Sequence, residues 1–347
     1  MNPAEEAGWL ARLLAKTNEY LSIPCVTGAE GVLLDHVAAD FQRLNMTVER
    51  TDGLVIVRPR APRPGKLHLF VRADRRGGVL DDDGQAQLTG GPSAQGAPDR
   101  LIGQAVYAFN PATGAHLSYG GITTITADDE GSPARLEISD LAGAPAKSPL
   151  AFDGRLDLTT PGYVYGPLAD TLNLAMVRIA AEMGADASFI FAGRGAHDRV
   201  ADRMLDWAEA GGLDPTRQLI GLCCGAFEES AAAQAGAVVL RRRDSVASFD
   251  ARAVARLERA AEAARAPILF KDAFIEAENT ARKRRNRPVI ALGDTEIGRI
   301  TARSRGAYTG ASLQLPVFAH AKGLGTTPGA LRASLRTVIE ACRMEEA

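Results

Sequence analysis

The stretch KLHLFVRADRRGG, residues 66–78, lies where the character of the sequence changes. Residues 67–71 form an apolar run with the length of a buried strand. Arg72, Ala73 and Asp74 follow it directly, and a glycine turn comes after them. Binding and catalytic groups often lie just beyond the carboxyl end of a strand in an α/β sheet. The sequence therefore predicts a functional site at Arg72 and Asp74.

The chain before this stretch predicts two helices and a hairpin. Apolar residues recur at helical spacing over residues 9–21. The segment TGAE, residues 27–30, has the form of a capping box at the start of a second helix. Residues 46–50 and 54–57 are predicted as two short strands around an Asp-Gly pair, which is typical of a β-hairpin.

The chain after this stretch changes to short segments in which apolar and polar residues alternate, such as QAVYAF, HLSYGGITTIT and ARLEISDL. Glycine, proline, aspartate and serine separate these segments at intervals of a strand and a turn. Such a pattern indicates short antiparallel strands. We therefore expect residues 76–160 to form an inserted domain that resembles a small β-barrel.

Helical and strand patterns alternate again after residue 160. The predicted helices are 170–183, 200–210, 251–264 and 328–342, and the predicted strands are 187–192, 218–224, 237–240, 268–270 and 289–292. Strands that alternate with helices form parallel sheets. The predicted fold is thus an α/β domain, residues 1–75 and 161–347, with a largely parallel central sheet sandwiched by helices.

The composition narrows the classes of partner. The 347 residues carry a net charge of −2, so no overall field favours nucleic acid or an anionic membrane. The two short basic runs, 241–244 and 281–287, lack the neighbouring aromatic residues of a nucleic-acid surface. No apolar run approaches the roughly 20 residues that span a bilayer, and the amino terminus does not resemble a signal peptide. The sequence predicts a cytoplasmic protein without nucleic-acid or membrane partners.

Four segments carry a family resemblance: YLSIPCVTGAEGVLLDHVAADFQRLN, YGPLADTLNLAMV, ALGDTEIGRI and GAYTGASLQLPVFAHAKG. In order and spacing they resemble segments of the co-catalytic zinc aminopeptidases, the tetrahedral and glutamyl aminopeptidase family. The likeness extends over nearly the whole chain, including a β insertion after the first catalytic strand. It implies an aminopeptidase-like fold and a homo-oligomer.

The resemblance also implies where the family's two zinc ions would be bound. The bridging aspartate corresponds to Asp170 and the late histidine to His320. The His-x-Asp motif of the family corresponds to Arg72-Ala73-Asp74. A guanidinium donates hydrogen bonds only and stays protonated, so Arg72 cannot replace a histidine ligand.

Two further ligand positions of the family also differ in this chain. The Glu-Glu pair corresponds to Gly195-Ala196, and the carboxylate after it to Cys223-Cys224. We therefore expect most metal ligands to be substituted, the ordinary dizinc hydrolysis to be absent and no metal cofactor to be bound.

Two interpretations of the site remain open. In the first, Arg72 and Arg194 supply the positive charge that the metal would have provided. They then either form structural ion pairs or bind a small anionic, amino-acid-like or peptide-like ligand. Whether the protein is an enzyme stays open in this interpretation.

In the second interpretation the protein is an enzyme with a rebuilt site, acting on an amide or a peptide-like small substrate. Cys223 or Cys224 would act as a thiolate with His197 and Asp74. Alternatively, thiolate and imidazole would hold a single zinc ion with Asp170 and His320. The ordinary alternatives are core packing for the two cysteines and an exposed loop for His197.

Overall fold

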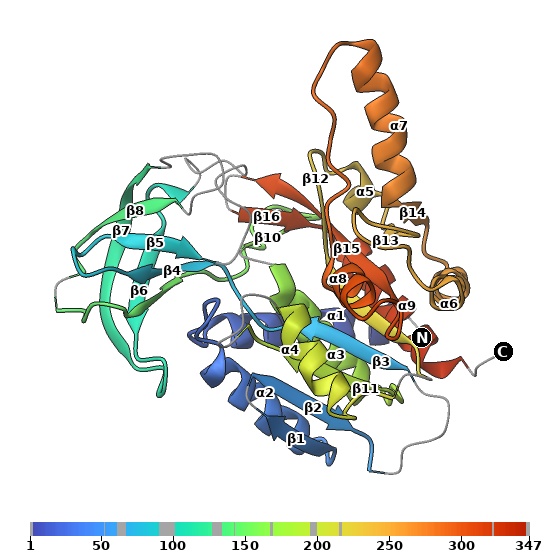
Figure 1. Ribbon diagram of the computed structural model, residues 1–347, viewed down its shortest axis with the longest axis horizontal. Coiled ribbons are helices and arrows are strands. Elements are labelled where there is room, and N and C mark those ends of the chain that lie inside the picture. Colours follow the sequence, from blue (N-terminus) through green and yellow to red (C-terminus); the bar gives the residue numbers. More distant parts are fainter. Residues whose placement is uncertain are drawn as a thin grey trace.

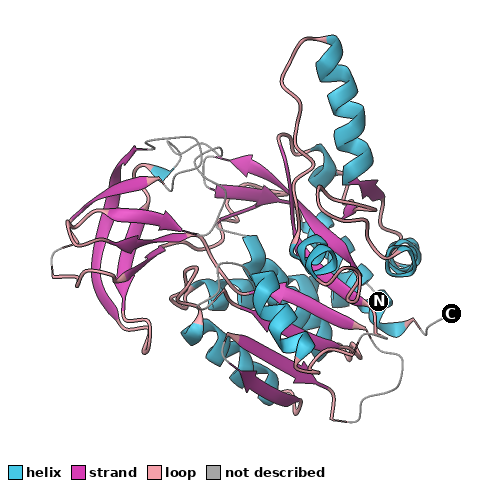
Figure 2. Ribbon diagram, viewed as in Figure 1, coloured by secondary structure: helices cyan, strands magenta, loops and turns pink. Residues whose placement is uncertain are grey.

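The computed structural model describes residues 3–51, 53–60, 67–89, 101–126, 134–141, 143–166, 169–194, 200–214, 217–320 and 323–344. Within these residues the chain forms a mixed α/β body and a separate β-barrel (Figure 1). Figure 2 shows the two parts by secondary structure, with helices confined almost entirely to the body. No helix in the described part of the chain has both the length and the apolar character needed to cross a membrane.

The helices are α1 (Pro3–Leu21), α2 (Gly31–Gln42), α3 (Ala169–Glu182), α4 (Val200–Glu209), α5 (Ala231–Gln234), α6 (Ala251–Ala263), α7 (Lys271–Arg284), α8 (Glu296–Arg303) and α9 (Pro328–Arg343). The strands of the body are β1 (Thr47–Thr51), β2 (Leu54–Arg58), β3 (His68–Arg72), β10 (Val164–Gly166), β11 (Ser188–Ala192), β12 (Leu219–Phe227), β13 (Val238–Leu240), β14 (Ile268–Phe270), β15 (Gly310–His320) and β16 (Gly323–Thr326). The barrel strands are β4 (Gly77–Leu80), β5 (Ala86–Thr89), β6 (Ala105–Phe109), β7 (His116–Thr126), β8 (Arg135–Ser139) and β9 (Pro149–Phe152).

The main sheet has the strand order β1-β2-β11-β3-β12-β15-β13-β14, and β16 links β10 to β15. Its four central strands, β11, β3, β12 and β15, run parallel to one another. The neighbours on either side, β2 and β13, run antiparallel to them. The predicted parallel sheet is confirmed for its centre, where the carboxyl ends of four strands come to one edge.

Helices cover both faces of this sheet. On β12, Cys224 lies beside Asn173 of α3, whereas a Cβ at Gly221 would meet Ile297 of α8. Residues three positions apart on a strand point to opposite faces, so α3 and α8 lie on opposite sides of the sheet. The central strands are continuous apolar runs because both of their faces are buried, as in β11, which is buried throughout.

The inserted β domain predicted after β3 is present. Its strands close into a barrel in the order β4-β5-β8-β7-β6-β9, and Figure 1 shows it standing apart from the body. It has its own small core, formed by residues that alternate along the strands, among them Leu80, Val106, Ile122, Leu136 and Leu150. The alternating sequence pattern therefore predicted the antiparallel strands of the barrel correctly.

Two local predictions were wrong, and the sequence did not predict every element. Residues 289–292 form no strand, and the chain around them returns from α7, a helix that the sequence did not predict. Residues 27–30 form no capping box, because Thr27 Oγ1 donates to Asp74 and the side chain of Glu30 accepts from Gly28. The late segment folds as the long strand β15, although a proline, Pro316, interrupts its pattern.

Candidate functional site

The candidate site lies at the carboxyl edge of the four parallel strands. Arg72, the last residue of β3, is the register partner of Ala192 in β11. On the other side, Leu222 of β12 is the partner of Val71, so Cys223 comes level with Arg72. The sheet thus brings together residues from three distant parts of the sequence. Arg72 lies at the end of β3, between β11 and β12.

The guanidinium of Arg72 contacts three carboxylates. Its Nε lies 3.1 Å from Oδ1 of Asp74 and donates a hydrogen bond of 2.9 Å to Oδ2 of Asp170. Its Nη1 lies 3.6 Å from Oε1 of Glu296. Asp170 lies in the first turn of α3 and Glu296 is the first residue of α8, so these two helices deliver acids to the end of β3 from opposite faces.

This arrangement affects the ionisation of both partners. The neighbouring acids, Asp170 most of all, raise the pKa of Arg72 above its usual value, so the guanidinium stays charged. Burial raises the pKa of Asp170 to about 6, against the opposing effect of Arg72. Asp170 therefore titrates near neutral pH, which is unusual for an aspartate. The side chain of Arg72 is 36% exposed, whereas that of Asp170 is 8% exposed.

Further hydrogen bonds fix the acids in place. Oδ2 of Asp74 accepts from Thr27 Oγ1 at 3.3 Å. Glu296 accepts from the backbone N–H of Ala201 at 3.0 Å and from Nη1 of Arg299 at 2.7 Å. Glu296 and Arg299 were not recognised as site residues in the sequence. Both lie in or directly beside the segment ALGDTEIGRI, so the family resemblance was the signal that could have pointed to them.

Arg194 lies two residues beyond β11, on the same edge as Asp74. Its backbone N–H donates to Oε1 of Glu30 at 3.0 Å, and the backbone of Gly28 donates to the same oxygen at 2.8 Å. Burial raises the pKa of Glu30. The Nε of Arg194 is buried without a hydrogen-bond partner in the described part of the chain. His197 lies outside the described residues, as do Gly195 and Ala196.

Cys223 and Cys224 point to opposite faces of β12. Sγ of Cys223 lies 3.4 Å from the hydroxyl of Ser312, and Sγ of Cys224 accepts from the amide of Asn173 at 3.9 Å. Burial raises the pKa of the Cys223 thiol and raises that of Cys224 well above the usual value. These surroundings favour neutral thiols, whereas a nucleophilic or metal-binding cysteine needs its thiolate.

His320 ends β15 and lies against an aromatic ring. Its imidazole stacks on Tyr165 with 4.0 Å between ring centroids, and the ring of Tyr163 also stacks on Tyr165, at 5.6 Å. In the part of the chain that the structure describes, no group of three or more histidines, cysteines, aspartates or glutamates is placed to hold a metal ion. Asp170 and His320 are therefore not joined there into a larger ligand set.

The residues around Asp170 do not fit the zinc centre that the family resemblance implies. Zinc sites use imidazole, thiolate and carboxylate ligands. Here the two carboxylates that would face a metal, Asp74 and Asp170, face the guanidinium of Arg72 at 3.1 and 2.9 Å instead. A permanent cation with only hydrogen-bond donors at this place competes with a metal ion for the same oxygens.

A second set of polar residues that the sequence analysis missed begins at Ser312, which contacts Cys223. Ser312 also accepts from the amide of Gln314, whose oxygen accepts from Nε of Arg241 at 3.4 Å. Nearby, burial lowers the pKa of Lys271 to about 8. The ammonium of Lys271 donates to the carbonyl of Ala226 at 2.7 Å. Nothing in the sequence around Lys271 distinguishes it from a surface lysine, because its burial depends on β12.

The fold of the chain is similar to that of known aminopeptidases. An aminopeptidase from the archaeon Desulfurococcus kamchatkensis matches 97% of this chain with 96% of its own, at a TM-score of 0.73 and 14% identity. A TET aminopeptidase from Thaumarchaeota archaeon SCGC AB-539-E09 aligns over 96% of this chain and 97% of its own chain, with a TM-score of 0.70 and 13% sequence identity. The TET1 peptidase of Pyrococcus horikoshii can assemble into a tetrahedron or a large octahedral shell. Its alignment covers 94% of this chain and 98% of the peptidase chain, with a TM-score of 0.67 and 14% sequence identity.

At these identities the likeness concerns the fold. No protein-family model matches the sequence, and no curated protein matches it. The expected aminopeptidase-like fold is confirmed, whereas the chemistry at the sheet edge has to be argued from the residues themselves.

Proposed function

We propose that this chain is an aminopeptidase-fold protein that binds a small amino-acid-like or peptide-like ligand at the carboxyl edge of its sheet, without a dizinc centre. The observation that carries this proposal is the position of Arg72, whose Nε lies 3.1 Å from Asp74 and 2.9 Å from Asp170. The guanidinium neutralises acids that a metal pair would otherwise neutralise. The ordinary dizinc mechanism is then absent.

The charges at the edge suit a zwitterion. Arg72 is partly exposed, so its guanidinium has donors for a carboxylate. The Nε of Arg194 is buried and lacks a hydrogen-bond partner among the described residues, so Arg194 adds positive charge at the same edge. Glu296 and Asp74 place carboxylates beside them, which can accept from an ammonium group. An amino acid or a short peptide with free termini carries both charges, whereas a simple anion would use only the arginines.

The metal part of the proposal is tested by elemental analysis of protein purified without chelator. We expect no stoichiometric zinc, and two zinc equivalents per chain would contradict the proposal. An Arg72→His variant restores the His-x-Asp pattern and removes the competing cation. We expect this variant, and not the wild type, to gain thermal stability when zinc is added.

The ligand part is tested by calorimetric titration with the dipeptide Ala-Ala. Charge-assisted hydrogen bonds are worth about 1.5–3 kcal/mol, so Arg194→Gln should weaken binding by about tenfold or more. Arg58→Gln is the matched control, since Arg58 lies on the surface and pairs with Glu49. The same dipeptide with both termini blocked should not bind. Equal binding of the blocked and unblocked forms would argue against charge recognition.

One observation favours the alternative, an enzyme with a rebuilt site. Burial raises the pKa of Asp170 to about 6, which is within the range of a general acid or base. Turnover of aminoacyl p-nitroanilides by metal-free protein, lost in Asp170→Asn, would support this alternative. Loss of that turnover on alkylation of Cys223 or Cys224 would add a role for a thiol.

We further propose that the protein forms a homo-oligomer through α7 and the barrel. Figure 1 shows α7 projecting from the body. Its free end carries the exposed basic residues Lys283, Arg284, Arg285 and Arg287. The turn between β4 and β5 carries the exposed acids Asp82 and Asp83. The basic end of α7 and the acidic turn of the barrel lie far apart in one molecule. Their opposite charges therefore suit a contact between α7 of one copy and the barrel of the next.

A further inference from the structure

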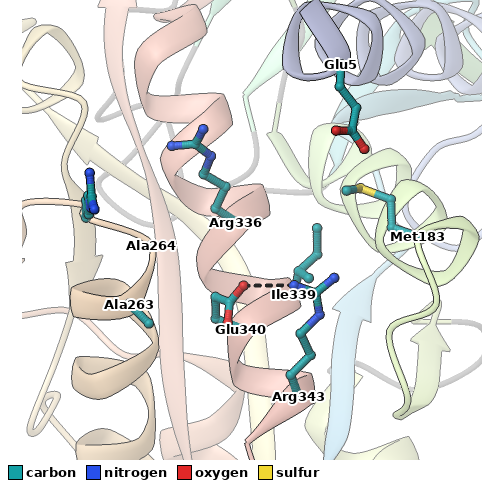
Figure 3. A pocket seen from close by; sticks show the side chains of 9 residues that line it. Glu5, Met183, Ala263, Ala264, Arg336, Ile339, Glu340 and Arg343 are labelled. Atoms are coloured by element: carbon teal, nitrogen blue, oxygen red, sulfur yellow. Dashed lines mark hydrogen bonds and ion pairs between the residues drawn. The ribbon is translucent and has the colours of Figure 1, made fainter. Parts of the chain in front are cut away.

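A cavity of about 490 Å³ lies on the body, away from the candidate site. Figure 3 shows the side chains that line it, which come from both ends of the chain and from two segments between them. Helix α9 contributes four of the nine lining residues, and the ends of α1, α3 and α6 close the remaining sides. The charged lining residues are Glu5, Arg265, Arg336, Glu340 and Arg343.

The charges of the lining are unequal. Three arginines and two glutamates give the wall a net charge of +1. Arg336 pairs with Glu6, which lies outside the lining, at 2.7 Å, and Arg343 pairs with Glu340 at 3.0 Å. Arg265 forms no ion pair with any residue that the structure describes. Within the described part of the chain, the cavity therefore has one guanidinium, that of Arg265, whose donors are available to an anion.

The remaining lining is apolar. Ile339 is 2% exposed and Ala264 is 7% exposed, and Met183 is half-buried beside them. An apolar wall next to guanidinium groups suits a ligand with two parts, since a hydrated inorganic anion gains nothing from the apolar part. Methionine adapts to ligands of different shape.

We propose that this cavity binds a small organic anion. Its carboxylate or phosphate group lies against Arg265 and Arg343, and its short apolar body lies against Met183 and Ile339. The site is separate from the sheet edge: α3 begins beside Asp170 and ends beside Met183, so about 20 Å of helix lies between the two. The inference is therefore independent of the function proposed for the sheet edge.

The test uses the full chain with sodium hexanoate as the probe. Calorimetry measures its binding, and thermal unfolding measures its effect on stability. We expect saturable binding of hexanoate and a rise in unfolding temperature. Hexan-1-ol, which lacks the charge, should bind more weakly by about tenfold, the loss of one charge-assisted contact. Inorganic phosphate keeps the charge but lacks the apolar body, so it should also bind more weakly than hexanoate, because it buries no apolar surface. Binding of phosphate as tight as that of hexanoate would overturn the role of the apolar wall.

The decisive variant is Arg265→Gly. Arg265 follows the end of α6 with φ +54°, a backbone conformation that glycine adopts without strain, so removal of the side chain should leave the fold intact. Arg305→Gly is the matched control, because Arg305 follows the end of α8 with φ +53° and does not line the cavity. We expect Arg265→Gly to weaken hexanoate binding by about tenfold and Arg305→Gly to leave it unchanged.

A steric variant provides a second, independent measurement. Ala263 is exposed at the rim, so Ala263→Trp fills the cavity without removing a charge. Hexanoate binding should be lost in this variant. Binding that survives both Ala263→Trp and Arg265→Gly would show that hexanoate binds elsewhere on the protein and would overturn the proposal.

Discussion

At the scale of the residue, Arg72 determines the electrostatics of the sheet edge. The ion pairs with Asp74 and Asp170 involve side chains that are 5% and 8% exposed, so both acids depend on this one cation. Breaking a buried ion pair leaves an uncompensated charge and costs about 3–5 kcal/mol. Solvent reaches Arg72 and screens part of this energy.

We therefore expect Arg72→Gln to lower the free energy of unfolding by about 2 kcal/mol at pH 7. Chemical denaturation of the variant and the wild type measures the difference. Arg58→Gln, which breaks an exposed pair with Glu49, should cost less than about 1 kcal/mol. Equal losses in the two variants would mean that Arg72 does not compensate the buried acids.

Asp170 gives a prediction for pH dependence. Burial raises its pKa from 3.8 to about 6 in the folded protein, so the folded state binds the proton more tightly than the unfolded state. Its contribution to stability is then full below about pH 4 and is lost as the pH rises through 6. A shift of two pKa units corresponds to about 3 kcal/mol.

Asp170→Asn removes this titration. The stability of the variant relative to the wild type should therefore increase by about 2 kcal/mol between pH 4.5 and pH 7.5. Denaturation curves at several pH values provide the measurement, and the exposed Asp82→Asn serves as the control. A relative stability that stays flat over this range would contradict the raised pKa.

At the scale of the element, α8 is held in place by a carboxylate that lies under its first turn. Oδ2 of Asp244 accepts from both the N–H and the hydroxyl of Thr295 at 2.9 Å, and Thr295 Oγ1 caps the helix by accepting from Gly298. A Cβ on Gly298 would collide with this carboxylate. Since Glu296 is the first residue of the helix, displacement of α8 would also displace an acid of the site.

Gly298→Ala should therefore destabilise the protein by about 1–3 kcal/mol, the cost of inserting a methyl group into a filled space. Gly8 is the matched control, because it lies in α1 with nothing within 4 Å of an added Cβ. Gly8→Ala should stabilise by about 0.5–1 kcal/mol. Thermal unfolding of both variants should thus give shifts of opposite sign, and shifts of the same sign would contradict this account of α8.

Elements with a continuous or periodic apolar pattern could be predicted from the sequence, and those without one could not. The central strands β3, β11 and β12 and the helices α3, α4, α6 and α9 lie close to their predicted bounds, whereas the central strand β15 was not predicted. Helix α7 was missed because it projects from the body and buries only Asp272 and Ile275, so its sequence carries no apolar stripe. Helix α8 is short, and its contact with the sheet is made by few residues.

At the scale of the whole molecule, assembly should depend on charge. Reversal of Lys283, Arg284 and Arg285 to glutamate should reduce the oligomer measured by light scattering at low ionic strength. A second set, Asp82→Lys and Asp83→Lys, should have the same effect alone and should restore assembly when both sets are combined. An oligomer that is indifferent to both sets, or a wild type that is monomeric at all salt concentrations, would exclude this contact.

The sequence by itself determined the architecture, because apolar periodicity reports which face of each element is buried. It also placed Arg72, Asp74, Asp170 and Arg194 at strand and helix ends, where a sheet edge collects them. Only the tertiary structure decided which charges meet. Glu296 reaches Arg72 from a helix more than 200 residues away along the chain, and burial by distant elements sets the pKa of Asp170 and of both thiols. Ionisation depends on this environment, which no local pattern of residues encodes.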